Sequence, residues 1–269
     1  MATLNEKANA SGPGEPLDGA PGLKNDLPVS EAEPSGALQN LIIDTKTFGI
    51  RLADTEDGRN SASLLINKMY AWRGYGSAHK VEANPNRITL AASEKNGTTI
   101  GTVTLGIDSE SGLLADEIFK DHLDAMRGSG AKICEITKLA FDHTVRSKHA
   151  LAALFHTLFI YSYYIHDRTH ALIEINPRHR RFYEHMLGFK RESELKMNTR
   201  VNAPAYLLRV NLAYVTEQIQ KYGGTWTSEP AERSFYPFFF SPREEEGIRA
   251  RLLNIDKRQS TGSPPPFYR

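Results

Sequence analysis

The 269-residue chain has only one cysteine, Cys134, so it cannot form an intrachain disulfide. It lacks any run of about 18 apolar residues, which a membrane-spanning helix needs, and its N-terminus lacks the basic-then-apolar pattern of a secretory signal. These absences predict a cytoplasmic protein. The formal net charge of +1 gives no reason to expect nucleic acid as a partner.

Aromatic residues are missing from the first 36 positions, which are rich in Gly, Pro and Ala. This stretch holds six acidic and two basic residues. It cannot bury enough apolar surface to offset the entropy of ordering, so residues 1–36 are predicted to be a disordered acidic tail. We place a folded domain at 37–222. A C-terminal extension at 223–269 carries the aromatic cluster Phe235–Phe240, a charged helix and a Ser/Pro-rich tail.

Hydrophobic periodicity predicts an alternation of strands and helices along residues 47–222. Strands are predicted at 47–53, 87–93, 98–107, 131–142, 171–175, 189–197 and 205–210, and helices at 57–71, 114–126, 147–164, 178–187 and 211–222. The Asn96-Gly97 pair between two β-rich runs indicates a hairpin. The predicted fold class is α/β (α+β): a mixed central sheet of six to seven strands, flanked by helices, with an extra helical extension at the C-terminus.

One segment, Phe182-Tyr183-Glu-His-Met-Leu-Gly188-Phe189, resembles the closing helix-to-strand motif of the GCN5-related N-acyltransferase superfamily. A more specific resemblance is to bacterial long-chain N-acyl amino acid synthases (FeeM-like enzymes), relatives of the acyl-homoserine lactone autoinducer synthases. The segments that carry it follow in the family's order: Leu65–Tyr75, Gly101–Leu105, Cys134–Asp142 and Asn176–Tyr183. The resemblance covers roughly residues 47–210.

This resemblance implies an N-acyltransferase that moves a long-chain fatty acyl group from acyl carrier protein to the α-amine of an amino acid. Glu135 falls on the family's acidic catalytic position, and Tyr183 on the tyrosine that lies beside the thioester sulfur. The donor is then acyl-phosphopantetheine, with acyl-CoA as the alternative, and no cofactor stays bound. Lys138 stands where autoinducer synthases have an arginine, and the loop at 76–84 keeps only one acid, Glu82, which favours an ordinary amino acid as acceptor.

Glu135 is also a candidate general base from its surroundings alone. On a strand it points away from Cys134, among apolar neighbours whose burial raises a carboxyl pKa. The alternative is a structural carboxylate paired with Lys138 or His143. Tyr183 is a candidate proton donor or a plain core aromatic. Cys134 is expected to be a small buried hydrophobic residue rather than a nucleophile.

The segment 142–150 lacks the glycine-rich loop that grips a CoA diphosphate at a helix N-terminus. It carries Arg146, Lys148 and His149 instead, which suit one phosphate of phosphopantetheine; a solvated basic turn is the alternative. We also assign Lys138, Leu139 and Asn176 to the donor site. The remaining assignments are Arg178, Arg180 and Arg181 to carrier-protein docking, and Tyr70, Arg73, Tyr75, Thr137 and Phe155 to the acceptor and acyl pocket.

Several alternatives stay open at this point. The apolar helix at 147–164 is either core or the wall of an acyl tunnel, and Phe235–Phe240 caps that tunnel, contacts a membrane peripherally or forms a subunit interface. His156, His166 and His170 match no zinc spacing, so no metal is expected. The competing functions are a CoA-dependent acetyltransferase and a non-catalytic lipid-binding module. The acceptor amino acid, the acyl chain length and the oligomeric state are not determined.

Overall fold

The computed structural model describes residues 41–145, 147–228 and 232–261. The chain divides into two units, Met1–Pro34 and Ser35–Arg269, and every described residue belongs to the second unit. The disorder predicted for residues 1–36 therefore lies outside the described residues.

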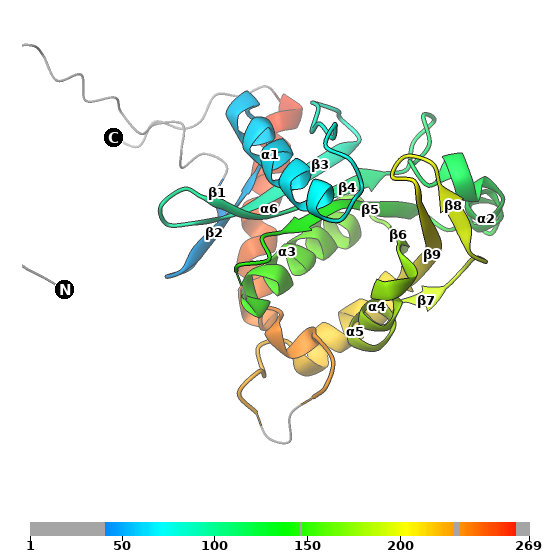
Figure 1. Ribbon diagram of the computed structural model, residues 1–269. Helices are drawn as coiled ribbons and strands as arrows, with labels where there is room; N and C mark the ends of the chain where they lie inside the picture. The colour runs from blue at the N-terminus through cyan, green and yellow to red at the C-terminus, as the bar shows by residue number, and fades with distance from the viewer. Residues whose placement is uncertain (1–40, 146, 229–231, 262–269) are drawn as a thin grey trace, which may run out of the picture. The chain divides into compact units, whose positions relative to one another are not determined.

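A sheet of nine strands runs through the described residues (Figure 1). In chain order the strands are β1 (Leu41–Asp44), β2 (Phe48–Leu52), β3 (Arg87–Glu94), β4 (Thr99–Ile107), β5 (Ile133–Phe141), β6 (His170–Ile175), β7 (Lys190–Arg191), β8 (Lys196–Asn198) and β9 (Ala203–Asn211). Their spatial order is β1-β2-β3-β4-β5-β6-β9-β7, with β8 paired to β9. All pairs are antiparallel except β5 and β6.

This mixed sheet confirms the predicted fold class, with more strands than the six to seven expected. The two additional strands are β1, which precedes the first predicted strand, and one that arises because the predicted strand 189–197 is divided into β7 and β8. β1 has only four residues, too few to show an alternating pattern in the sequence. The predicted hairpin is confirmed between β3 and β4, where Gly97 adopts a positive φ of 87° that favours glycine.

The described helices cover the sheet. They are α1 (Glu56–Trp72), α2 (Asp116–Gly128), α3 (Lys148–Ile160), α4 (Arg180–Leu187), α5 (Leu212–Tyr222) and α6 (Pro242–Thr261), with a π-helical turn at Tyr161–Ile165 and 3-10 turns at Pro177–His179 and Tyr236–Phe238. The predicted helix 147–164 thus changes to π geometry at Tyr161. Side chains of α3 pack with Cys134 and Ile136, whereas those of α2 pack with Ile133. Because β5 residues alternate between faces, α3 and α2 cover opposite faces of the sheet.

The parallel strands β5 and β6 separate partway along their length. They pair only from Ile133–Ile136 to His170–Ile173, after which β5 follows β4 and β6 follows β9. At the same point β5 contains a bulge, because its register with β4 shifts. Lys138 in this bulge has φ of +50°, an uncommon conformation for a residue with a side chain. The bulge and the separation open the sheet on the side of Glu135.

The aromatic cluster Phe235–Phe240 is packed into the core. Phe235, Tyr236 and Phe239 are buried, and the Tyr236 hydroxyl donates a hydrogen bond of 2.7 Å to the Leu187 carbonyl at the end of α4. Most of the apolar side chains of this cluster are therefore covered by the protein, which argues against the peripheral membrane contact considered above. None of the helices in the described ranges is both long and apolar enough to cross a bilayer.

A buried polar pair fastens α6 to α3. His156 is fully buried; its Nδ1 accepts a hydrogen bond of 3.0 Å from the Phe240 backbone N–H, so its Nε2 carries the proton that faces Glu245 Oε2 at 2.7 Å. Burial lowers the pKa of His156 and keeps the imidazole neutral, while the Glu245 carboxylate opposes that shift. The C-terminal extension is thus attached to the core through both polar and apolar contacts.

Replacing Glu245 with alanine should lower the free energy of unfolding by about 1–3 kcal/mol, because the buried His156 Nε2–H then loses its acceptor. The neighbouring Glu246 is exposed, so Glu246→Ala is a matched control that should change stability by less than about 0.5 kcal/mol. Urea denaturation followed by circular dichroism measures both. Equal effects of the two substitutions would show that the buried pair does not stabilise the extension.

Candidate active site

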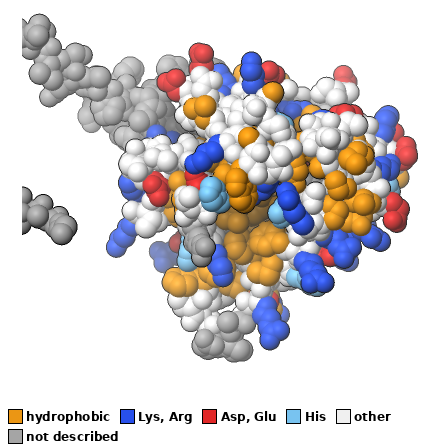
Figure 2. Space-filling model, in the orientation of Figure 1, with side chains coloured by type: hydrophobic (Ala, Val, Ile, Leu, Met, Phe, Trp, Pro, Cys, Tyr) orange, Lys and Arg blue, Asp and Glu red, His pale blue; other side chains and the backbone are white. Residues whose placement is uncertain are grey.

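A cleft of about 560 Å³ lies where β5 and β6 separate. Figure 2 shows a hollow with hydrophobic side chains in its wall and Lys and Arg side chains at its edge. Most of the residues predicted from the sequence for catalysis, donor and acceptor line this cleft: Tyr70, Arg73, Tyr75, Glu135, Thr137, Lys138, Leu139, Asn176 and Tyr183. Residues from α1, β5, β6 and α4 thereby meet around one space, although they are spread over more than a hundred positions of the sequence.

Glu135 is the most strongly perturbed acid of the cleft. Its side chain is 2% exposed; Oε2 accepts a hydrogen bond of 2.8 Å from the Leu114 backbone N–H, and Oε1 is buried without any hydrogen-bond partner in the described part of the chain. Burial, helped by the negative charge of Glu174, raises the pKa of Glu135 to about 8. Neither Lys138 nor His143 pairs with Glu135, which excludes the structural pairings considered above: Lys138 donates to the Lys80 carbonyl, and His143 stacks on Trp72.

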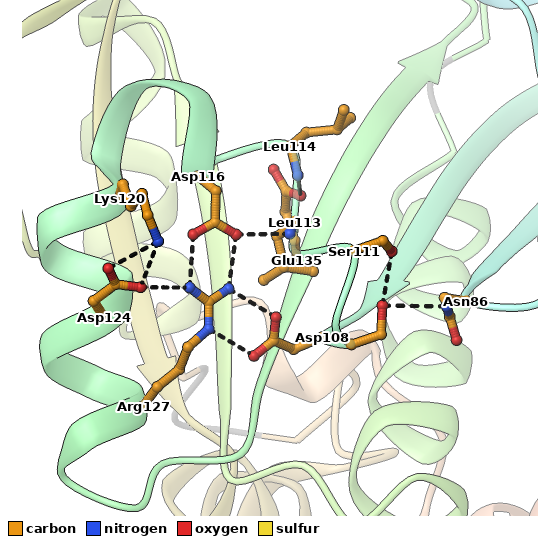
Figure 3. A network of polar contacts seen from close by, with 11 residues as sticks. Asn86, Asp108, Ser111, Leu113, Leu114, Asp116, Lys120, Asp124, Arg127 and Glu135 are labelled. Carbon is orange, nitrogen blue, oxygen red and sulfur yellow. Dashed lines mark hydrogen bonds and ion pairs between the residues drawn. The ribbon is translucent and has the colours of Figure 1, made fainter.

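The backbone N–H that binds Glu135 is held in place by an ionic network, shown in Figure 3. Arg127 on α2 donates to both oxygens of Asp116 and to both oxygens of Asp108, at 2.6–2.9 Å. Asp116 in turn accepts the Leu113 N–H at 2.7 Å, next to the Leu114 N–H that reaches Glu135. The network therefore fixes the loop that supplies the only hydrogen bond accepted by the Glu135 side chain from any residue that the structure describes. No motif in the sequence pointed to these residues.

A second buried carboxylate, Glu174 on β6, also lines the cleft. Unlike Glu135, it has several partners: Arg200 donates to Oε1, and the Asn198 side chain donates to Oε2 at 2.6 Å. Arg200 is held further by Glu117 at 2.7 Å and by the Leu114 carbonyl at 2.9 Å. Sequence analysis missed this cluster. An acid in the apolar strand 171–175 was a usable signal for Glu174, but nothing local marks Arg200 as its partner.

Tyr183 on α4 is buried against Phe155, Phe182 and Phe189, whose rings meet it edge to face. Burial raises the pKa of Tyr183 well above its usual range, so its hydroxyl stays protonated at neutral pH. Burial also raises the pKa of the neighbouring cleft residue Tyr70 to about 12. The cleft therefore presents a carboxyl group that titrates near neutrality and two phenols that can only donate protons.

The residues predicted to bind the donor are divided between the cleft and its surroundings. Lys148 and His149, in the first turn of α3, do not line the cleft; they contact Phe238 and Trp226 of the C-terminal extension. Arg146 lies outside the described residues. Phe155 also lies outside the cleft lining, beside an apolar cavity of about 40 Å³.

The predicted docking arginines lie at and just after the end of β6. The Arg178 guanidinium donates a hydrogen bond of 2.6 Å to the Tyr75 hydroxyl and stacks on that ring, so it links two edges of the cleft. Arg180 pairs with Glu184 at 3.4 Å, and Arg181 is exposed. Cys134 is fully buried, and burial raises its pKa to about 12, which leaves the thiol protonated. Within the described ranges no group of three His, Cys, Asp or Glu side chains forms a possible metal site.

A mixed sheet that separates between its two parallel strands, with a buried carboxyl group and a protonated tyrosine on the resulting cleft, defines an N-acyltransferase of the GCN5-related fold. A family model described as N-acyl amino acid synthase FeeM matches residues 61–211, more than half of the chain. The chain belongs to this family, and it is an acyltransferase.

The chain also resembles solved structures. The structure of FeeM, an N-acyl amino acid synthase from uncultured soil microbes, is similar with a TM-score of 0.56 and 28% identity, over 62% of this chain and 92% of that chain. The AHL synthase LasI has a TM-score of 0.43 and 12% identity, over 61% and 89%. An acyl-CoA N-acyltransferase from Pseudomonas aeruginosa has a TM-score of 0.43 and 12% identity, over 60% and 97%. No curated protein sequence matches the chain.

The raised pKa of Glu135 predicts a pH-dependent effect of Glu135→Gln on stability. The folded protein keeps this proton up to about pH 8, while an unfolded chain loses it near pH 4.5, so wild-type stability falls as pH rises between these values. Glutamine cannot ionise. The stability of Glu135→Gln relative to wild type should therefore increase by a few kcal/mol from pH 5 to pH 9, as measured by denaturant titration at each pH.

Glu194 is exposed, so Glu194→Gln is the control and should follow the wild-type pH profile. A difference between Glu135→Gln and wild type that does not change with pH would show that the carboxyl group titrates normally in the folded state.

Proposed function

We propose that this acyltransferase moves a long-chain fatty acyl group from the phosphopantetheine of acyl carrier protein to the α-amine of an amino acid. The observation that carries the proposal is Glu135, a carboxyl group buried on the cleft with one oxygen unpaired and a pKa of about 8. An amino acid is mostly protonated on its amine at neutral pH, and a base with a pKa in this range is well matched to remove that proton. Membership of the FeeM family supports the same reaction.

The proposed reaction is a direct transfer. In its ionised form Glu135 accepts a proton from the ammonium group and releases it to solvent, and the free amine attacks the thioester carbonyl carbon. A C–N bond forms, the attacking nitrogen gives its extra proton to Glu135, the tetrahedral intermediate collapses, and the C–S bond breaks. Tyr183 donates its proton to the leaving thiolate and regains one from solvent or from Glu135, so the products are an N-acyl amino acid and free phosphopantetheine thiol. Cys134 takes no part, because its buried thiol lies on the opposite face of β5.

The surroundings of α3 support a carrier-protein donor over CoA. Ser147 already caps the helix, its hydroxyl accepting the Ala150 N–H at 3.1 Å, and aromatic side chains of the extension lie against Lys148 and His149. The Asp142 carboxylate, which binds Lys68 and Thr144, places a negative charge in the same turn. A single phosphate is easier to accommodate here than a diphosphate, which needs several free backbone N–H groups.

Replacing Glu135 with glutamine should lower kcat by about 10²–10⁴-fold, the usual contribution of a general base. The reaction is measured with dodecanoyl-acyl carrier protein and amino acids, alongside mass spectrometry of lipids from a bacterium that overexpresses each variant. New masses equal to a fatty acid plus an amino acid minus water should appear with wild type only. A folded Glu135→Gln variant with wild-type turnover would refute the base; no product from wild type would favour a short-chain CoA enzyme or a lipid binder.

Reversing the charge of exposed Arg181 should raise KM for dodecanoyl-acyl carrier protein by about 5- to 10-fold and leave KM for dodecanoyl-CoA unchanged, because only the acidic carrier protein meets the basic rim. The effect should shrink at high salt. Lys46→Glu, an exposed site in the turn between β1 and β2, is the control and should change neither KM. Equal changes for both donors would argue against carrier-protein docking at Arg181.

A further inference from the structure

A second pocket reaches Glu135 from the side of β3 and β4. It has a volume of about 280 Å³ and shares Arg87, Leu114, Glu135 and Thr137 with the main cleft. Its other walls come from the end of β4, which contributes Gly106 and Ile107, and from two loops. One loop contributes Asn84 and Asn86, and the other contributes Ser111, Gly112 and Leu113. The two loops are joined, because the Asn86 amide donates to Ser109 at 3.2 Å and Ser109 contacts Ser111 at 2.9 Å (Figure 3).

Three residues lie in a row across neighbouring strands at the floor of this pocket. Arg87 on β3 is paired with Gly106 on β4, and Gly106 is paired with Glu135 on β5. Residues directly opposite each other in an antiparallel sheet project from the same face. Because Gly106 has no side chain, a gap is left between the guanidinium of Arg87 and the carboxyl group of Glu135. A guanidinium and a carboxyl group thus flank a position of the sheet that has no side chain of its own.

Arg87 is the basic residue that lines the second pocket, and its guanidinium has no partner among the described residues. Arg200 is bound by Glu117 and Glu174, and Lys138 donates to the Lys80 carbonyl. Arg87 lies close enough for its charge to lower the pKa of Glu135, yet its side chain forms no hydrogen bond or ion pair with any described residue. On the other side of the gap, Glu135 Oε1 is buried and also lacks a partner. The gap therefore has the guanidinium of Arg87 at one end and Oε1 of Glu135 at the other, and neither has a hydrogen-bond partner among the described residues.

We propose that this pocket binds the acceptor, with the α-carboxylate on Arg87, the amine against Glu135 Oε1 and a polar side chain towards Asn86 and Ser111. An α-amino acid carries its ammonium and carboxylate groups on one carbon, so it matches an acid and a guanidinium on either side of one glycine. The main cleft is then left for the acyl donor. This assignment rests on the proposed amino acid acylation. It places the substrate carboxylate on Arg87 rather than on Arg73, which the sequence assigned to the acceptor and acyl pocket.

Arg73 is the matched alternative. It also lines the main cleft, but its guanidinium donates to the Met69 carbonyl at 3.3 Å and stacks on Trp72, and it does not line the second pocket. Comparing Arg87→Met with Arg73→Met thus compares two arginines of the same cleft that differ in their access to the gap. Gly106→Ala provides an independent probe, because a methyl group there meets its nearest neighbour, Leu113 Cδ2, at 3.6 Å and fills the gap without a clash.

The test uses the full chain with dodecanoyl-acyl carrier protein, the proteinogenic amino acids and the α-carboxamide of the best acceptor. Wild type should acylate the free amino acid with a higher kcat/KM than its α-carboxamide. Among amino acids it should prefer those with polar side chains. Arg87→Met should lower kcat/KM for the amino acid by about 10- to 100-fold, mainly through KM, and leave the carboxamide rate unchanged. Arg87→Lys should restore part of the loss, and Gly106→Ala should disfavour the larger acceptors. Arg73→Met should preserve the preference for the free amino acid over its α-carboxamide.

Binding without turnover separates this proposal from the proposed function. Calorimetry measures the affinity of each variant for the N-dodecanoyl amino acid and for its carboxamide. Suppose that wild type acylates amino acids, that Arg73→Met abolishes the preference for the amino acid over its carboxamide, and that Arg87→Met keeps it. The pocket assignment is then wrong and the proposed function stands. If no amino acid is acylated yet the N-dodecanoyl amino acid binds in a manner that depends on Arg87, the function is wrong and the pocket stands. Neither turnover nor Arg87-dependent binding would overturn both.

Discussion

The burial of one carboxyl group, Glu135, is the constraint on which the rest of the site depends. Removing an acid from water is unfavourable unless it is protonated or fully hydrogen-bonded. Here a single backbone N–H, that of Leu114, reaches the side chain, and the second oxygen has no partner among the described residues. The structure therefore keeps a group that gains from accepting a proton or from binding a donor, at the point where two pockets meet.

The residues and strands that position Glu135 are themselves held by ion pairs and by pairing within the sheet. Arg127 joins Asp108 and Asp116 across the start of α2, and this holds the loop that supplies the Leu114 N–H. The bulge at Lys138 separates β5 from β6 just beyond Glu135, which opens the cleft without breaking the pairing of β5 with β4. Rigid contacts on both sides allow an under-paired carboxyl group to remain in one position.

The elements of this fold and its central acid were predictable because their signals are local. Strand periodicity located β5 and the face of Glu135, and the Phe182–Phe189 motif located Tyr183. The partners that tune the site were not predictable, because Arg127 pairs with Asp108 19 positions away and Arg200 pairs with Glu174 26 positions away, and no local pattern marks such pairs. The cluster Phe235–Phe240 illustrates a related limit: its hydrophobicity predicts that it will be covered, but only the fold shows that α3, α4 and α5 cover it.

Two carboxyl groups lie on the cleft, and the contrast between them supports the proposed base. Burial raises the pKa of Glu174 as well, but hydrogen bonds from Arg200 and Asn198 stabilise its charged form and oppose that shift. That retained negative charge disfavours ionisation of Glu135, whose own surroundings supply only one hydrogen bond. Paired carboxyl groups with unequal environments separate in pKa, and the less stabilised one is suited to exchange protons near neutral pH. This contrast supports the proposal that Glu135 rather than Glu174 transfers the proton, because proton transfer by Glu174 would require Arg200 to give up its partner.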